Sequence, residues 1–390
     1  MKVYLVAGEP SGDKLGAELM AGLKSCAPYE LDFCGVGGFL MEEQGLTSLF
    51  PISEIAVMGI GEILAKYSFL KKRIKNTVDD ILRLKPDVLI TIDAPEFSLR
   101  VAKMVRKKLF INTIHYVAPT VWAWRPNRAK KISGYVDHIL ALFPFEPPYM
   151  QREGISCDFV GHPVANENLP EPRLVKKFRK QHKIGENDTL VAFLPGSRIS
   201  EVDRLMPVFK NVSSMLISQK LNTRIVTVVA PAVEHIVVEN LQRWGNNIIV
   251  VTKDDLSSND FQKLKRVVFA SCDIALAASG TVSLELASTE TPTVIAYDMG
   301  FLSRLVFRLL VRVKSVNLVN LVSQQHTIPE FIGSNCKPDK IFQALVNQLD
   351  DPIGQKTAMR KSLDLLKVGG ENSGTVAAKS VIDFLEMHKT

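Results

Sequence analysis

Short, wholly apolar runs alternate along this chain with longer segments in which apolar residues recur at helical spacing. The strand-like runs lie at 2–7, 87–92, 110–117, 138–142, 189–194, 224–230, 247–251, 273–278 and 293–297. The helix-like segments lie at 13–24, 68–84, 201–220, 281–289 and 339–349. Because strands that are apolar on both faces need cover on both faces, the alternation predicts an α/β fold with parallel, doubly wound sheets.

A proline-rich polar stretch, PVANENLPEPR at residues 163–173, interrupts this alternation. A basic helix-like segment and a new apolar run follow it, so we interpret it as a linker between domains covering 1–168 and 169–365. A chain of 390 residues is long enough for two domains of ordinary size. Two doubly wound domains joined in this way predict a ligand cleft between them, at the carboxyl ends of the strands.

The composition excludes several classes of protein. Hydrophobic residues make up 46% of the chain, which is usual for a globular protein. The five cysteines are scattered without a C-x-x-C pair, which argues against a disulfide framework or a structural zinc site. The first residues lack the basic start, long apolar stretch and cleavage site of a signal peptide, so we expect them to form a core strand. No apolar run approaches the ~20 residues that span a bilayer. We therefore expect a cytoplasmic protein.

The net charge of +7 is concentrated in basic clusters at 70–75, 103–108, 125–131 and 304–314. Solvated faces of ordinary helices explain most of them. Beside apolar stretches, such clusters also suit an anionic partner, which can be a nucleic acid, a phosphorylated substrate or a membrane surface. The common nucleic-acid-binding signatures are absent from the sequence, so we expect no nucleic-acid partner.

Two segments have the pattern of helices that lie on a membrane. Arg304, Arg308 and Arg312 repeat every four residues beside an apolar stripe. In the other segment, apolar residues precede the cluster at 70–75, and they include Val57, Met58 and Ile60. Helices of this kind can contact anionic lipid headgroups. A core helix with a basic outer face fits the same pattern at least as well.

A loop in the second half has the composition of an anion site. Gly196, Ser197 and Arg198 follow the apolar run 189–194 and precede a helix-like segment, whose start at Ser200-x-x-Asp203 resembles a capping box. Backbone N–H groups, a hydroxyl and a guanidinium can bind an anion without a metal. An ordinary turn with a surface arginine is an equally good interpretation of this stretch alone.

A second small-residue loop, Ser279-Gly280-Thr281, follows the apolar run 273–278. Glu285 lies four residues after Thr281, on the same helix face, where it can accept hydrogen bonds from ribose hydroxyls. Such a loop alone is a weak signal, because many helices begin this way. Two of them on neighbouring strands would indicate a site for a nucleotide diphosphate.

The first half offers a different kind of candidate. Asp93 follows the apolar run 87–92, at the position where chemistry occurs in α/β clefts. Capping of the next helix is the alternative function for this carboxylate. Trp122 and Trp124 lie after another strand-like run, where they form either a binding wall or core filling.

Several motifs are absent from the sequence. There is no D-x-D, Walker A, H-E-x-x-H or G-x-S-x-G, so neither a metal-held nucleotide nor a cofactor is expected. The opening loop GEPSGD places its glycines at Gly8, Gly12 and Gly16, which is not the dinucleotide-binding spacing.

The blocks VAGEPSGD, AVMGIGE, PDVLITIDAPEF, IHYVAPTVWAWRPNR, FVGHPV, LPGSRISEV, ASGTVSLELA and NLVNL occur in a distinctive order. In this combination, over residues 2 to about 340, the chain resembles the lipid-A-disaccharide synthases of glycosyltransferase family 19. The resemblance implies a GT-B fold, with two Rossmann-like domains facing each other across a cleft and helices at about 366–390 packing on the first.

The resemblance also implies a reaction. The family transfers 2,3-diacylglucosamine from UDP-2,3-diacylglucosamine to the 6-hydroxyl of 2,3-diacylglucosamine 1-phosphate, with inversion and without a metal. The expected partners are these two substrates and the anionic inner leaflet of the inner membrane, with a homodimer as an option for assembly. Acyl chains on both substrates would give the apolar and basic segments a purpose.

The resemblance assigns functions to particular residues. Asp93 matches the position of the catalytic base. The positions that match the UDP-sugar site are Gly196, Ser197, Arg198, Ser279, Gly280, Thr281, Glu285 and Asn320. The opening loop then belongs to the acceptor domain, where its acids can bind hydroxyls or cap the following helix, and the expected acceptor contacts are Glu9, Ser11, Gly12, Asp13 and Trp124. This chain departs from the family pattern at Val319, usually proline, and at Asp298, usually basic.

Other interpretations remain open on the sequence. An undecaprenyl-linked N-acetylglucosaminyltransferase and a UDP-N-acetylglucosamine 2-epimerase share the expected fold, but the VWAWR and DAPEF blocks disfavour both. A non-catalytic protein that binds lipid or nucleotide is an alternative of another class.

Overall fold

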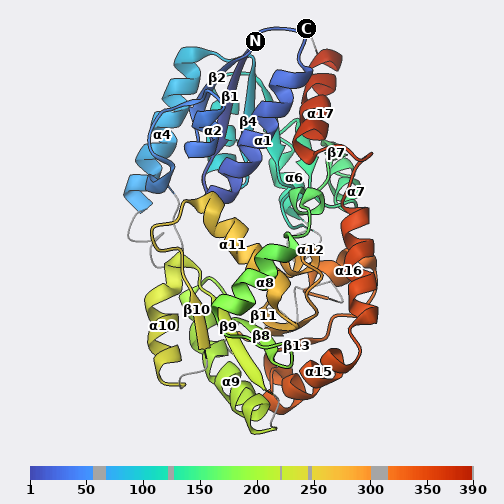
Figure 1. Cartoon of the computed structure of the whole chain (residues 1–390). Helices are drawn as coiled ribbons and strands as arrows, with labels where there is room; N and C mark the ends of the chain where they lie inside the picture. Colours follow the sequence, from blue (N-terminus) through green and yellow to red (C-terminus); the bar gives the residue numbers. More distant parts are fainter. Residues whose placement is uncertain (56–66, 122–126, 220–221, 245–247, 300–314, 389–390) are drawn as a thin grey trace. The chain divides into compact units, whose positions relative to one another are not determined.

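The computed structural model describes residues 1–390 except 56–66, 122–126, 220–221, 245–247, 300–314 and 389–390. The chain divides into two compact units (Figure 1). Unit 1 contains Met1–Asn166 together with Leu366–Thr390, and unit 2 contains Glu167–Leu365. The second unit is therefore inserted, in sequence, between two parts of the first.

Unit 1 is built on a seven-stranded sheet with the order β3-β2-β1-β4-β5-β6-β7. Its strands are β1 (Lys2–Ala7), β2 (Asp32–Val36), β3 (Thr47–Ser48), β4 (Val88–Ile92), β5 (Asn112–Tyr116), β6 (His138–Ala141) and β7 (Ser156–Phe159). All of these pairings are parallel. The parallel, doubly wound arrangement that the sequence predicts is confirmed.

The helices of unit 1 lie on both faces of this sheet. They are α1 (Pro10–Cys26), α2 (Phe39–Glu43), α4 (Tyr67–Leu84), α5 (Ser98–Arg106), α6 (Asn127–Ile132), α7 (Pro147–Gln151) and α17 (Ser373–Met387).

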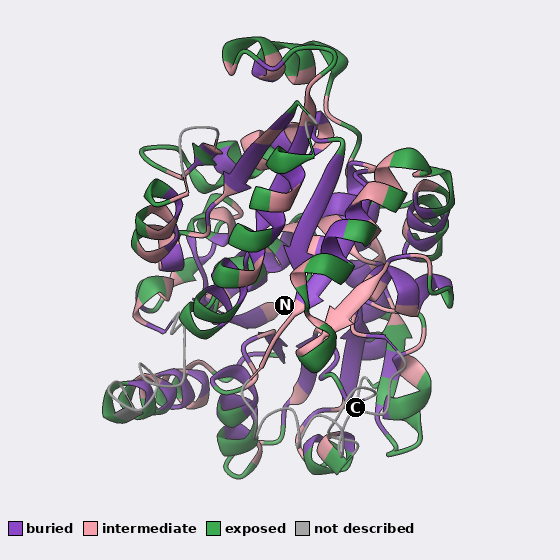
Figure 2. Cartoon of the chain, turned by 90° about the horizontal axis from the view of Figure 1, so that it is seen from below, coloured by how far each residue is buried: buried purple, intermediate pink, exposed green. Residues whose placement is uncertain are grey.

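The packing of β1 explains why this strand is apolar throughout. Val3 and Leu5 belong to the core cluster beneath α1 and α17, whereas Tyr4 and Val6 belong to the one beneath α4 and α5. Side chains alternate between the faces of a strand, so both sets must be apolar. Figure 2 shows the central strands coloured as buried.

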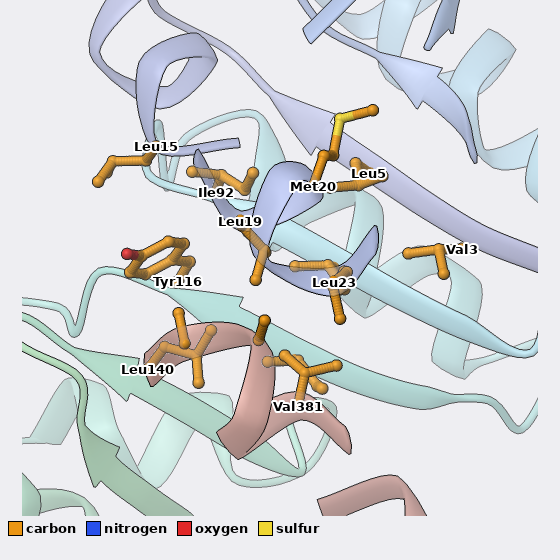
Figure 3. Close-up of a cluster of buried hydrophobic side chains, with 14 of the residues drawn as sticks. Val3, Leu5, Leu15, Leu19, Met20, Leu23, Ile92, Tyr116, Leu140 and Val381 are labelled. Carbon is orange, nitrogen blue, oxygen red and sulfur yellow. The ribbon is translucent and has the colours of Figure 1, made fainter. Parts of the chain in front are cut away.

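Helix α17, at the C-terminal end, packs against α1, the first helix in the sequence (Figure 1). Glycines permit a close approach between them: a Cβ added to Gly22 would lie 2.5 Å from the carbonyl oxygen of Gly374. Figure 3 shows Leu19 and Leu23 of α1 in one cluster with Val381 of α17. The C-terminal helix thus completes the core of unit 1.

A buried polar contact also holds α17 to the sheet. The Ser380 hydroxyl lies 2.9 Å from Nε2 of His138 in β6 and donates to the Asp158 carboxylate of β7 at 2.7 Å. Phe384 stacks on the His138 ring with 4.8 Å between centroids. These contacts hold α17 against β6 and β7.

Unit 2 has a six-stranded parallel sheet with the order β10-β9-β8-β11-β12-β13. Its strands are β8 (Thr189–Leu194), β9 (Thr223–Val228), β10 (Ile248–Val251), β11 (Ile274–Ala278), β12 (Thr293–Tyr297) and β13 (Glu330–Ile332). Its helices are α8 (Pro172–Gln181), α9 (Ile199–Ser218), α10 (Glu234–Gln242), α11 (Ser258–Ser271), α12 (Val282–Ser288), α14 (Leu318–Ser323), α15 (Pro338–Asp350) and α16 (Ile353–Leu365).

Four strands, β2, β3, β7 and β13, are not among the predicted runs. Each is short or is interrupted by polar residues or glycine, as in DFCGV of β2 and SCDF of β7. They lie toward the edges of the two sheets. Strands at an edge need not be apolar on both faces, so the pattern that reveals central strands does not reveal these.

Replacement of Gly22 by alanine tests the contact between α1 and α17. The added methyl group would collide with backbone atoms that no rotamer change can move. We expect overpacking to cost about 2–3 kcal/mol, more than the ~1 kcal/mol that alanine gains over glycine in a helix. The urea midpoint of the Gly22→Ala variant should therefore fall.

Gly134→Ala is the matched control in the same unit, because a Cβ there meets no atom within 4 Å. Its free energy of unfolding should change by no more than about 0.5 kcal/mol. Equal midpoints for the two variants would contradict the close packing of these helices.

Candidate active site

Asp93 lies directly after β4 in an unusual backbone conformation. Its φ is +46° and that of Ala94 is +42°, so two consecutive non-glycine residues are left-handed. This conformation costs of order 1 kcal/mol per residue and persists only where the surroundings enforce it. The Asp93 amide donates to the Tyr116 carbonyl at 3.0 Å, and the Ser98 hydroxyl donates to the Asp93 carbonyl. These hydrogen bonds hold the backbone of Asp93 in the left-handed conformation.

The opening loop of the chain packs against this strand end. A Cβ added to Gly8 would lie 2.5 Å from Cβ of Ala94, and one added to Gly12 would lie 3.4 Å from the Ile92 carbonyl oxygen. Only a residue without a side chain fits at Gly8. The close approach brings the Ser11 hydroxyl to 3.5 Å from Oδ2 of Asp93. Glycine spacing in this loop therefore serves contact with β4.

The surroundings of Asp93 favour a proton acceptor. The side chain is half-buried. Burial raises the pKa of the Asp93 carboxyl above its ordinary value, against opposing hydrogen bonds from the Ala94 backbone and the Ser11 hydroxyl. A base is more effective as its pKa approaches the working pH, so the direction of this shift suits proton abstraction.

The two acids of the opening loop have different surroundings. Asp13 is buried, and its carboxylate accepts from the backbone amides of Gly38, Leu40 and Met41 at 2.8–3.1 Å. It therefore caps the start of α2, whereas the sequence suggested a cap for the helix that follows the loop. Glu9 is exposed at the N-terminus of α1. Of the two acids, Glu9 is the one at the surface.

In unit 2, Glu201 lies against the loop between β8 and α9. Gly196 has a φ of +112°, and a Cβ there would lie 2.7 Å from Oε2 of Glu201. The buried Glu201 also accepts from the guanidinium of Arg198 at 2.8 Å, while Arg198 itself is largely exposed. The capping box expected at Ser200 is wrong, because α9 begins at Ile199 and its N-cap residue is Arg198.

The Ser279-Gly280-Thr281 loop lies between β11 and α12. Strands β8 and β11 are parallel neighbours, so this loop and the Gly196-Ser197-Arg198 loop follow adjacent strands at the same edge of the sheet. This is the arrangement that would indicate a site for a nucleotide diphosphate. The Ser279 hydroxyl donates to the Val316 carbonyl at 3.1 Å. Glu285 pairs with Lys265 of α11, with 2.7 Å between Oε2 and Nζ.

Asn320 is buried in α14, and its amide is bonded to the protein itself. Nδ2 donates to the Ile328 carbonyl at 2.9 Å and to Oε1 of Glu330 at 2.7 Å. Oδ1 accepts from the Ile328 amide at 3.0 Å. The structure thus places Asn320 in an internal network.

In unit 2, charged side chains that the sequence did not single out contact predicted site residues; they include Glu201, Lys265 and Glu330. The spacing of Glu201, three residues after Arg198 at a helix start, was a usable signal. Lys265 and Glu330 come from other elements, and no local pattern identifies them.

Some predicted residues lie outside the described part of the chain. These are Trp124, Trp122 and the predicted membrane-contact residues Val57, Met58, Ile60, Arg304, Arg308 and Arg312.

Among the residues that the structure does describe, no group of His, Cys, Asp and Glu is arranged to hold a metal ion. No helix within the described ranges is long and apolar enough to cross a membrane.

Two solved structures with the same architecture share little sequence with this chain. The S. aureus MnaA–UDP co-structure superposes with a TM-score of 0.64 at 12% identity, covering 99% of this chain and 96% of that one. The UDP-GlcNAc 2-epimerase from Neisseria meningitidis bound to UDP-GlcNAc gives 0.64 at 13%, with both chains fully covered. At such identity these similarities establish the fold alone, which is the two-domain GT-B fold.

Similarity in sequence is much more specific. The family model described as lipid-A-disaccharide synthetase matches residues 3–381. The lipid-A-disaccharide synthase of Ruegeria pomeroyi is 46% identical over 385 residues, covering 99% of this chain and 96% of the relative. That of Paramagnetospirillum magneticum is 37% identical over 395 residues, covering 100% and 99%. The chain belongs to the lipid-A-disaccharide synthase family, whose members are glycosyltransferases of lipid A biosynthesis.

Proposed function

We propose that this chain transfers 2,3-diacylglucosamine from UDP-2,3-diacylglucosamine to the 6-hydroxyl of 2,3-diacylglucosamine 1-phosphate. The products are the β-1,6-linked lipid A disaccharide 1-phosphate and UDP. The observation that carries the proposal is the 46% identity to a lipid-A-disaccharide synthase over almost the whole of both chains. UDP and UDP-GlcNAc bound to proteins of the same fold support a UDP-sugar as the donor.

A β product from an α-linked donor requires one inversion, and hence a single in-line displacement. The acceptor O6 forms a bond to C1 of the donor sugar as the bond from C1 to the diphosphate oxygen breaks. UDP leaves with the electron pair, and the proton of the 6-hydroxyl passes to Asp93. The raised pKa of the half-buried Asp93 supports this assignment as base.

The negative charge of the leaving UDP needs stabilisation. We assign this to the two loops on β8 and β11, with Gly196, Ser197 and Arg198 on one and Ser279, Gly280 and Thr281 on the other. Backbone N–H groups and the exposed Arg198 guanidinium are suited to a diphosphate. Groups fixed in advance can replace a metal ion in this task, so we propose a metal-independent reaction. Glu285 is proposed to accept from the ribose hydroxyls.

The acceptor sugar is proposed to bind at the opening loop, where Ser11 lies beside Asp93 and Glu9 is exposed. Gly12 lets this loop approach β4 closely. Asp13 contributes by capping α2. The assignment of Trp124 to the same site rests on the family resemblance.

Formation of the disaccharide tests the reaction directly. The pure protein, incubated with both diacylated substrates in the presence of EDTA, should yield the disaccharide 1-phosphate and one equivalent of UDP by mass spectrometry. An incubation that leaves both substrates unchanged, with and without EDTA, would contradict the proposal. Dependence of turnover on an added divalent cation would contradict only its metal independence.

Asp93→Asn keeps the shape of the side chain and removes the base. We expect kcat to fall by about 10²–10⁴-fold, while the affinity for UDP is unchanged. The control is Glu96→Gln, which removes an exposed carboxylate three residues away that pairs with Arg100. Near-normal turnover of Asp93→Asn would exclude Asp93 as the base.

The pH profile reports on the same carboxylate. Ionised Asp93 is the active form, so kcat/KM falls on the acid side as Asp93 is protonated. Ser11→Ala removes a hydrogen bond that lowers the pKa of Asp93. We expect this variant to move the acid limb of kcat/KM to higher pH, whereas Ser133→Ala, at an exposed serine of the same unit, should leave it in place. A shift to lower pH would be inconsistent with this environment.

We also propose that the protein acts at the cytoplasmic face of the inner membrane, because both substrates carry acyl chains. Replacing Arg304, Arg308 and Arg312 together by serine should reduce sedimentation with anionic vesicles at low salt. A control that removes the same charge from exposed α8 residues, Arg173, Lys176 and Lys177, should sediment as the wild type does. Equal sedimentation of all three proteins would refute contact through the 304–312 segment.

A further inference from the structure

Glu330, the first residue of β13, receives several hydrogen bonds from one preceding segment. Nδ2 of Asn320 donates to its Oε1 at 2.7 Å, and the Ser315 hydroxyl donates to the same oxygen. The backbone amide of Val316 donates to its Oε2 at 2.8 Å. A single carboxylate therefore holds both the turn at 315–316 and the side chain of α14 that follows it.

The turn held by Glu330 contacts the loop assigned to the UDP diphosphate. The carbonyl of Val316, whose amide is bonded to Glu330, accepts from the Ser279 hydroxyl at 3.1 Å. At Gly280 the backbone φ is +155°, and a Cβ there would meet nothing within 4 Å. The loop is also held from its own helix, where the Ser283 hydroxyl donates to the Gly280 carbonyl at 2.9 Å. The Ser279 side chain thus ties the loop to the segment that begins at Ser315.

The chemistry of this cluster requires a carboxylate. All of its partners are donors: a side-chain amide N–H, a hydroxyl and a backbone N–H. An ionised carboxylate offers acceptors on both oxygens. A glutamine of the same shape must turn its NH₂ group toward at least one of these donors, which breaks the contact and leaves a donor without a partner.

We propose that Glu330 is a positioning residue for the Ser279-Gly280-Thr281 loop, acting through Val316. The inference rests on the proposed function, in which this loop binds the diphosphate of the UDP-sugar. Asn320 takes part in the same network: its amide is committed to Ile328 and Glu330, so it supports the site by holding Glu330 in place.

Titration calorimetry of the full chain with free UDP tests the inference. Glu330→Gln should bind UDP about ten- to a hundred-fold more weakly, since hydrogen bonds to a charged group are lost. In steady-state assays, KM for the UDP-sugar should rise more than kcat falls. Glu290→Gln is the control, because it removes a carboxylate of unit 2 that pairs with Arg360. It should bind UDP with the affinity of the wild type.

A double-mutant cycle separates positioning from a general loss of stability. If Glu330 acts through Val316 and Ser279, the Glu330→Gln/Ser279→Ala protein should bind UDP within about two- to three-fold of the weaker single variant. Effects that multiply would overturn the inference. If Glu330→Gln does not fold, Ser315→Ala removes one donor to Glu330 and takes its place in the cycle.

Two negative results have different meanings. A wild-type protein that binds UDP together with a Glu330→Gln protein of equal affinity overturns the inference and leaves the proposed function standing. A wild-type protein that binds no UDP overturns both.

Discussion

Every strand pairing in the described part of the two sheets is parallel, and this constraint decides where the candidate site residues lie. Parallel strands present their carboxyl ends at one edge, so the loops that follow neighbouring strands meet there. In unit 1 the neighbours are β1 and β4, which bring the opening loop to Asp93. In unit 2 they are β8 and β11, which bring the Arg198 loop beside the Ser279 loop.

Much of this arrangement could be predicted, because the central strands are apolar on both faces and are followed by glycine, serine or acidic residues. This pattern predicts Asp93 and the loops at Gly196-Ser197-Arg198 and Ser279-Gly280-Thr281. It does not predict which side chains hold several of the predicted site residues in place. Asp13 binds amides of residues 38–41, Glu285 pairs with Lys265, and Asn320 contacts Glu330, and each partner comes from another element. Tertiary packing brings these groups together, and no periodicity in the sequence records it.

Acidic residues that bind backbone amides occur in both units. Asp13 accepts from the amides at the start of α2, and Glu330 accepts from the amide of Val316. In both cases a carboxylate accepts from backbone donors, which helps to fix a loop in one conformation. A carboxylate beside a predicted ligand site is therefore not necessarily a ligand, as Asp13 in the opening loop illustrates.

The packing of α17 on α1 has a consequence for the order in which the chain can fold during synthesis. Residues 167–365 form a continuous unit whose elements all emerge from the ribosome before α17 does. The surface of α1 around Gly22, by contrast, stays open until residues 373–387 have been made. Domains usually fold as units from the N-terminus onward. Here the unit that begins first is the one that must be completed last.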